Sequence, residues 1–184
     1  MRHTPVLVDL GEMLHSPGMR SPMDVNVPCT DELELGCTSP IVGNVVFTNT
    51  GNLLVIQGHV RVTLKTECPR CLGDVETEVD APVDEEFTVT ENVVTSRAED
   101  DETMDDPTFR ALFPESHILD LSELARQSIV LATPMLPVCR EDCRGLCPHC
   151  GANLNETQCD CEAPVDSPFA ALQGYYDDTA PAEE

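Results

Sequence analysis

The chain has 184 residues, which is long enough for one ordinary domain with an appended module. Asp and Glu number 34 against ten Lys and Arg, so the formal net charge is −24, and no Lys or Arg follows Arg144. A surface this acidic repels duplex or folded RNA, because nucleic-acid binders offer a basic face to the phosphates. The composition therefore favours basic proteins as partners.

The N-terminal region lacks the pattern of a targeting or membrane segment. Its first twenty residues hold one short apolar run, residues 5–10, which Asp9 interrupts. A signal peptide needs a charged start and a longer apolar stretch, and a membrane helix needs about 20 apolar residues. We therefore expect a cytoplasmic protein, in which clustered cysteines are more often metal ligands than disulfides.

The first half of the chain predicts strands. Residues 5–10 indicate a short strand, whereas the Pro-, Gly- and Ser-rich stretch 11–28 indicates a loop or an irregular region. From Ile41 onward, runs of β-branched and apolar residues are typical of strands joined by tight turns. The predicted strands cover residues 41–48, 53–57 and 58–67, separated by the Thr-Gly-Asn turn at 50–52 and by Gly58. Apolar and polar residues alternate from His59 to Lys65, so one face of that strand is buried.

The meander continues through short predicted strands at 77–79 and 87–89. Residues 84–106 are sharply acidic, with Arg97 as the only cation. Such a charge run is typical of a solvated loop, and it is also suited to docking a basic partner.

One convincing helix follows, over residues 121–132. Asp120 is placed to cap it, and Glu123 is the residue that would complete a capping box. Pro134 and Pro137 end the helical pattern, and a second, short helix is predicted to begin at Ser167.

These elements predict an α+β fold, mainly an antiparallel β-sheet meander with one packed α-helix and a C-terminal Cys-rich zinc-knuckle module. The predicted boundaries are 1–138 for the sheet domain with its helix near 121–132, 139–163 for the Cys-rich zinc-binding module, and 164–184 for a short helix and an acidic tail.

Six of the ten cysteines lie between Cys139 and Cys161. Cys147-Pro-His-Cys150 followed by Gly151 has the spacing of a zinc knuckle, in which two thiolates of one tight turn meet a single ion. Cys159 and Cys161 supply a second pair of thiolates eight residues after the first pair closes.

Counting ligands divides these cysteines into two tetrahedral sites. Six thiols exceed one site, and Cys68 and Cys71 form another Cys-x-x-Cys pair after a strand, whereas Cys29 and Cys37 have no such spacing. We therefore predict two structural zinc ions, with a single site and spare thiols as the alternative. The first predicted site has Cys68, Cys71, Cys139 and Cys143 as ligands, and the second has Cys147, Cys150, Cys159 and Cys161.

Catalytic interpretations are weaker. The Cys68–Cys71 spacing is that of a thiol-disulfide motif, but a strand-like pattern follows it and not the helix that would lower the thiol pKa. The five histidines are scattered, no nucleophile or phosphate-loop motif is present, and all-Cys zinc sites are closed and structural. We therefore expect a protein that is not an enzyme and takes no small-molecule substrate.

In their order and spacing, these motifs resemble the YceD family, the large ribosomal RNA subunit accumulation proteins. The resemblance covers about residues 40 to 175. It implies a role in accumulation of 23S rRNA and in large-subunit assembly, and no enzymatic activity is established for the family. Some members lack much of the cysteine cluster, which implies that zinc supports the fold. The matching motifs are Glu67-Cys-Pro-Arg-Cys-Leu72, Ile118-Leu-Asp-Leu121, Ile129-Val-Leu-Ala-Thr-Pro-Met-Leu-Pro137, Cys143-Arg-Gly-Leu-Cys-Pro-His-Cys-Gly-Ala-Asn-Leu-Asn155, Cys159-Asp-Cys161 and Pro168-Phe-Ala-Ala-Leu172.

The leading hypothesis is a non-catalytic ribosome biogenesis factor that binds a basic ribosomal protein or another assembly factor, with any link to rRNA indirect. One alternative is a zinc module that binds rRNA directly through Arg140, Arg144 and His149. Another is a thiol-redox switch at Cys68 and Cys71.

Overall fold

A computed structural model describes residues 5–30, 33–95 and 107–161. The chain divides into two compact units, the first made of residues 1–68 and 73–139 and the second of residues 69–72 and 140–184. Residues 69–72, which interrupt the first unit, thus pack with the C-terminal segment. The division of the sequence at 138 and 163 stays a prediction, and the helix expected from Ser167 lies outside the described residues.

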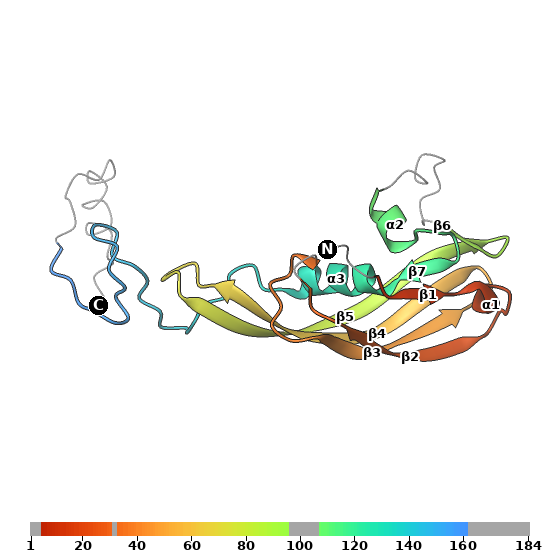
Figure 1. Cartoon of the computed structure of the whole chain (residues 1–184), viewed down its shortest axis with the longest axis horizontal. Coiled ribbons are helices and arrows are strands. Elements are labelled where there is room, and N and C mark those ends of the chain that lie inside the picture. The colour runs from red at the N-terminus through yellow and green to blue at the C-terminus, as the bar shows by residue number, and fades with distance from the viewer. Residues whose placement is uncertain (1–4, 31–32, 96–106, 162–184) are drawn as a thin grey trace, which may run out of the picture. The chain divides into compact units, whose positions relative to one another are not determined.

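The first unit is built on a five-stranded antiparallel meander (Figure 1). Its strands, in chain order and also in spatial order, are β2 (Arg20–Val27), β3 (Ile41–Asn49), β4 (Leu53–Glu67), β5 (Asp74–Thr90) and β6 (Val93–Thr95). A separate two-stranded ribbon pairs β1 (Leu7–Asp9) with β7 (Ile118–Asp120). The described part of the chain is therefore mainly antiparallel sheet, as predicted.

Three helices complete the described residues: α1 (Gly11–Leu14), α2 (Pro107–Leu112) and α3 (Leu121–Ala132). The predicted helix and its cap are confirmed in α3, where Oδ1 of Asp120 accepts hydrogen bonds from the N–H groups of Ser122 at 2.9 Å and Glu123 at 3.2 Å. The carboxylate of Glu123 instead binds the side chains of Arg126 and Gln127.

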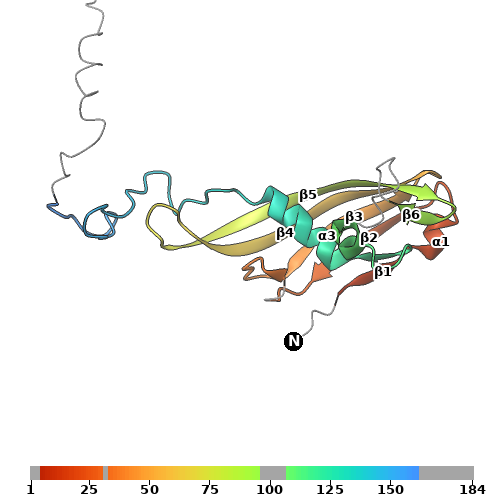
Figure 2. The same cartoon turned by 90° about the horizontal axis from the view of Figure 1, so that it is seen from above.

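The core lies between the sheet and a second layer. Figures 1 and 2 show α3 and the β1–β7 ribbon over the same face of the sheet, and α3 contacts β5 and β4. The predicted alternation in β4 is confirmed, with Val60, Val62 and Leu64 buried on the face toward α3. Three aromatic rings close the end near α2, where Phe87 packs edge-on against Phe113 with ring centroids 4.9 Å apart. The opposite face of the sheet carries exposed side chains.

The structure corrects four predictions. The short strands expected at 77–79 and 87–89 are parts of one continuous strand, β5. Residues 11–28 are not a loop, because they contain α1 and the edge strand β2, where Pro22 is tolerated at the sheet margin. Gly58 does not separate two strands but lies inside the continuous β4. The acidic stretch 84–106 is not a loop throughout, since residues 84–90 belong to β5 and residues 93–95 form β6. Residues 96–106 lie outside the described residues.

Gly43 and Gly58 are required where β3 and β4 approach each other. A Cβ atom at Gly58 would lie 2.1 Å from the carbonyl oxygen of Asn44, and one at Gly43 would lie 2.0 Å from that of His59. These are backbone atoms of the neighbouring strand, so the strands would have to shift to admit even a methyl group. Glycine here permits the close approach and does not terminate the strand.

We predict that Gly58→Ala destabilises the first unit by about 2 kcal/mol or more, because overpacking against backbone cannot relax through a rotamer change. Urea unfolding should show the loss. Gly11→Ala is the matched control, since the nearest atom there is the flexible Asp9 carboxylate at 3.1 Å. Equal stability of the two variants would contradict the close approach of β3 and β4.

Candidate functional site

The four C-terminal cysteines of the predicted knuckle lie together. The sulfur atoms of Cys147, Cys150, Cys159 and Cys161 are within 4.8 Å of one another. Gly151, at φ 71°, donates its N–H to the carbonyl of Cys147 at 2.9 Å and closes the turn. The N–H of His149 points at the sulfur of Cys147, 3.5 Å away. The turn thus directs two thiols and a backbone donor toward one point.

The crowded sulfurs have unequal affinities for protons. Backbone N–H groups of Cys150 and His149 lower the pKa of Cys147 to about 6, because they stabilise its thiolate. A hydrogen bond to Cys147 raises the pKa of Cys159, and one to Cys150 raises the pKa of Cys161 to about 12. Four thiolates in so small a space repel one another, so their full deprotonation calls for a cation at the centre.

The second group contains Cys68, Cys71, Cys139 and Cys143, again with all four sulfur atoms within 4.8 Å of one another. Cys68, Cys71 and Cys143 are buried and Cys139 is exposed. Cys68 and Cys71 lie in the turn that joins β4 to β5. The N–H of Cys68 closes this turn by donating to the carbonyl of Gly73 at 2.8 Å. Each of the two groups could hold a metal ion, and the eight predicted residues fall into the two predicted sets. Their role as ligands stays a prediction.

Arg70 holds the second unit together from within. Its Nη1 donates to the carbonyls of Glu141 at 3.0 Å and Cys143 at 3.2 Å, and its own carbonyl accepts the N–H of Leu146 at 3.0 Å. Gly145, at φ 74°, passes so close that a Cβ atom there would lie 2.9 Å from the carbonyl oxygen of Arg70. This guanidinium is committed to the backbone of its own unit and is poorly placed to bind a phosphate.

Asn155 is a supporting residue that the sequence analysis missed. Its Oδ1 accepts hydrogen bonds from Nη2 of Arg140 at 2.7 Å and from the N–H of Arg144 at 2.9 Å, and its Nδ2 donates to the sulfur of Cys143 at 3.3 Å. A side-chain amide that donates to a thiolate orients it and offsets its charge, as outer-shell partners of metal ligands do. The Asn-Leu-Asn sequence at 153–155 was the available signal, but nothing local indicates its contact with Cys143.

We predict that Asn155→Ala exposes Cys143 to alkylation by iodoacetamide about fivefold faster, since one hydrogen bond of about 1 kcal/mol is lost. Peptide mass spectrometry can follow the labelling of Cys143. Thr157→Ala is the control, because its hydroxyl bonds only the carbonyl of Asn153, at 3.1 Å. Unchanged labelling of the Asn155 variant would show that the amide does not protect the sulfur.

A disulfide joins Cys29 to Cys37, the two cysteines to which the sequence analysis gave no role. Their Cα atoms are 5.9 Å apart, within the usual range for a disulfide. Cys37 also forms an isolated antiparallel bridge with Leu64 of β4. No disulfide joins Cys68 to Cys71, the pair of the redox hypothesis.

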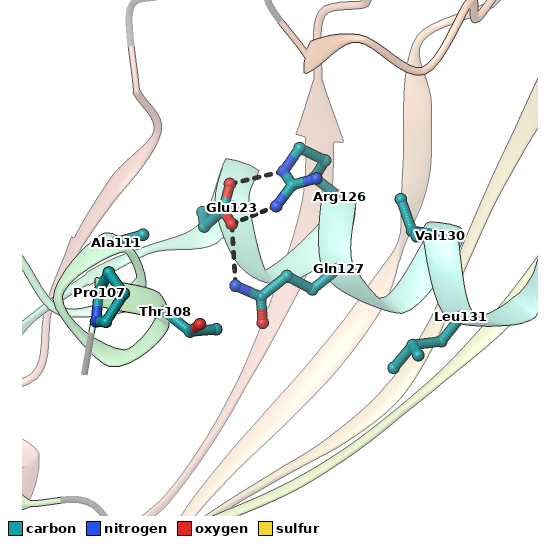
Figure 3. Close-up of a pocket in the computed structure, with 8 residues that line it drawn as sticks. All are labelled: Pro107, Thr108, Ala111, Glu123, Arg126, Gln127, Val130 and Leu131. Carbon is teal, nitrogen blue, oxygen red and sulfur yellow. Dashed lines mark hydrogen bonds and ion pairs between the residues drawn. The ribbon is translucent and has the colours of Figure 1, made fainter. Parts of the chain in front are cut away.

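A groove of about 450 Å³ lies between α2 and α3 (Figure 3). Its polar side chains are bound to one another, since Glu123 accepts hydrogen bonds from Arg126 at 2.6 and 2.7 Å and from Gln127 at 2.8 Å. Val130 and Leu131, which are 51% and 82% exposed, form an apolar part of its lining. The charges of Glu123 and Arg126 in this groove are thus paired with each other.

Among the described residues, none of the helices is both long and apolar enough to span a membrane. The described chain is thus a mainly antiparallel sheet protein with two groups of four cysteines that could bind metal.

Comparison with known proteins identifies its class. The chain matches the family described as large ribosomal RNA subunit accumulation protein YceD over residues 56–174, and it belongs to that family. It matches no solved structure.

The relatives differ in how much of the chain they cover. An uncharacterized protein of Mycobacterium tuberculosis is 29% identical over 158 residues, covering 82% of this chain and 72% of its own length. Two plant proteins are named large ribosomal RNA subunit accumulation protein YCED homolog 1, chloroplastic. The one from Zea mays is 29% identical over 75% of this chain and 54% of its own. That from Arabidopsis thaliana is 40% identical over only 26% of this chain and 15% of its own.

Proposed function

We propose that this protein is a non-catalytic, cytoplasmic factor that supports accumulation of 23S rRNA and assembly of the large ribosomal subunit. The observation that carries the proposal is membership in the YceD family over residues 56–174. This range includes β5, α3 and all eight cysteines of the two groups. The absence of a catalytic motif from the sequence is consistent with a binding role.

The partner that fits this chain is a basic ribosomal protein or a basic assembly factor. The formal net charge of −24 favours association with cationic partners. Direct binding of rRNA through the cysteine-rich unit has less support, because Arg70 and Arg140 both donate to groups of their own unit. Arg140 also lies 3.4 Å from the carboxylate of Asp142.

We also propose that each group of four cysteines binds one zinc ion. Four thiolates are the donor set of closed structural zinc sites, and sulfurs at about 2.3 Å from a tetrahedral zinc ion lie about 3.8 Å apart. The observed limit of 4.8 Å therefore requires only a small contraction. Zinc in these positions would stabilise the short, irregular second unit, which contains no helix or strand among its described residues.

Native mass spectrometry should find two zinc ions per chain. The double substitution Cys147→Ser with Cys150→Ser should leave one ion, and so should Cys68→Ser with Cys71→Ser, because a tetrahedral site cannot close on two ligands.

The matched control for these variants is Cys29→Ser with Cys37→Ser, which removes two cysteines outside both groups and should keep both ions. A single ion in the unmodified protein, or loss of an ion from the control, would contradict the two-site arrangement.

Depletion of the protein from growing cells should lower the 23S rRNA signal and the large-subunit peak in sucrose-gradient profiles, with 16S rRNA as the internal reference. Expression of the intact chain should restore both. Profiles that stay unchanged after depletion would refute the proposed function.

A further inference from the structure

The face of the five-stranded sheet that points away from α3 is called the open face here. It consists of the outward side chains of β2 to β5, and Figure 1 shows the described helices and the β1–β7 ribbon on the other side. A sheet face that no described element covers is either solvated or a docking surface. The side chains on it decide between the two.

Most outward residues of β5 are acidic. Seven of the 17 residues of β5 are Asp or Glu and none is Lys or Arg. Because side chains alternate along a strand, six of these carboxylates share the open face at a spacing of about 6.8 Å for consecutive members. They are Asp74, Glu76, Glu78, Asp80, Asp84 and Glu86, with the outward position between Asp80 and Asp84 filled by Pro82.

Strand β4 supplies only part of the neutralising charge. Nζ of Lys65 lies 2.8 Å from the carboxylate of Asp74, and the guanidinium of Arg61 lies 3.0 Å from that of Asp80. Glu76 is the register partner of Lys65 and Glu78 that of Thr63, but within the described residues neither glutamate forms an ion pair of its own. The face therefore keeps excess negative charge on a rigid strand.

Apolar side chains lie on the same face, beside the carboxylates. Val42 of β3 is 44% exposed and is the register partner of Arg61. Val46 of β3 and Val55 of β4 are half-buried on the same face. These valines give a partner apolar surface beside the carboxylates, from which an interface can exclude water.

We propose that the open face binds an extended basic segment of a partner protein. The carboxylates of Glu76 and Glu78 contact Lys or Arg side chains that alternate along the segment, because both chains then have the same spacing. Val42 contacts the aliphatic portions of those side chains. This inference rests on the proposed function only for the basic character of the partner. It adds the surface of this chain that binds the partner.

The test uses the full chain and a fluorescent twelve-residue peptide of alternating lysine and threonine. We expect Glu76→Gln with Glu78→Gln to weaken binding about fivefold at low salt, since each removes one exposed charge contact, and the difference should shrink as salt is added. The matched control is Glu12→Gln with Glu91→Gln, which changes the net charge equally at exposed positions outside this face and should bind like the unmodified protein.

A second pair of variants tests the apolar contact. Val42→Thr should weaken binding about threefold, because a methyl group is replaced by a hydroxyl in the interface. Val130→Thr, at a similarly exposed valine on α3, should have no effect. Thermal unfolding of all four variants checks that each remains folded.

Equal effects of the Glu76/Glu78 variant and its control, or no effect of either, would overturn the assignment of this face. A 23S rRNA transcript that binds the unmodified protein in the absence of peptide, and binds the Glu76/Glu78 variant less well, would also overturn it, in favour of RNA. The proposed function is tested separately by the depletion experiment, which measures 23S rRNA and does not involve the peptide.

Discussion

The pairing of β4 with β5 is the interaction on which the rest of the structure depends. The register runs without a break from Leu53 opposite Thr88 to Glu67 opposite Asp74. Its inward side chains pack beneath α3, and its outward side chains form the acidic open face. Its tight turn, residues 68–73, presents two of the cysteines. One long hairpin thus sets the core, the charged surface and part of a candidate metal centre.

A shift of one residue in this register would be costly. Side chains alternate between the two faces, so such a slip would turn the carboxylates of β5 into the core and Val79, Ala81 and Val83 out to water. The acidic pattern therefore specifies the pairing as well as the surface. The close approach at Gly43 and Gly58 adds a second constraint, because only glycine fits there and only in this alignment of β3 with β4.

The sequence predicted the features that depend on local patterns. Alternation from His59 to Lys65 indicated a half-buried strand, Asp120 marked the start of α3, and cysteine spacing indicated two groups of four. Features that depend on distant contacts were missed. The N–H of Val6 donates to the hydroxyl of Ser122 at 3.0 Å, and neither neighbourhood indicates that β1 pairs with β7. The Cys29–Cys37 disulfide joins residues only eight positions apart, and it was missed because spacing alone does not give the distance between Cα atoms.

The two groups of cysteines and the acidic open face have different physical consequences. The thiols lie in two groups of four, and Cys68, Cys71, Cys143 and Cys147 are buried. With Arg70 and Asn155 hydrogen-bonded beside them, these groups are suited to holding a short unit in shape. The carboxylates of β5 lie on a face that no described element covers, and their charge would attract a basic partner before any contact forms. The stability of the second unit and the affinity for a partner are therefore separable properties of this chain. Loss of cysteines and loss of β5 glutamates should accordingly differ, the first acting on stability and the second on binding alone.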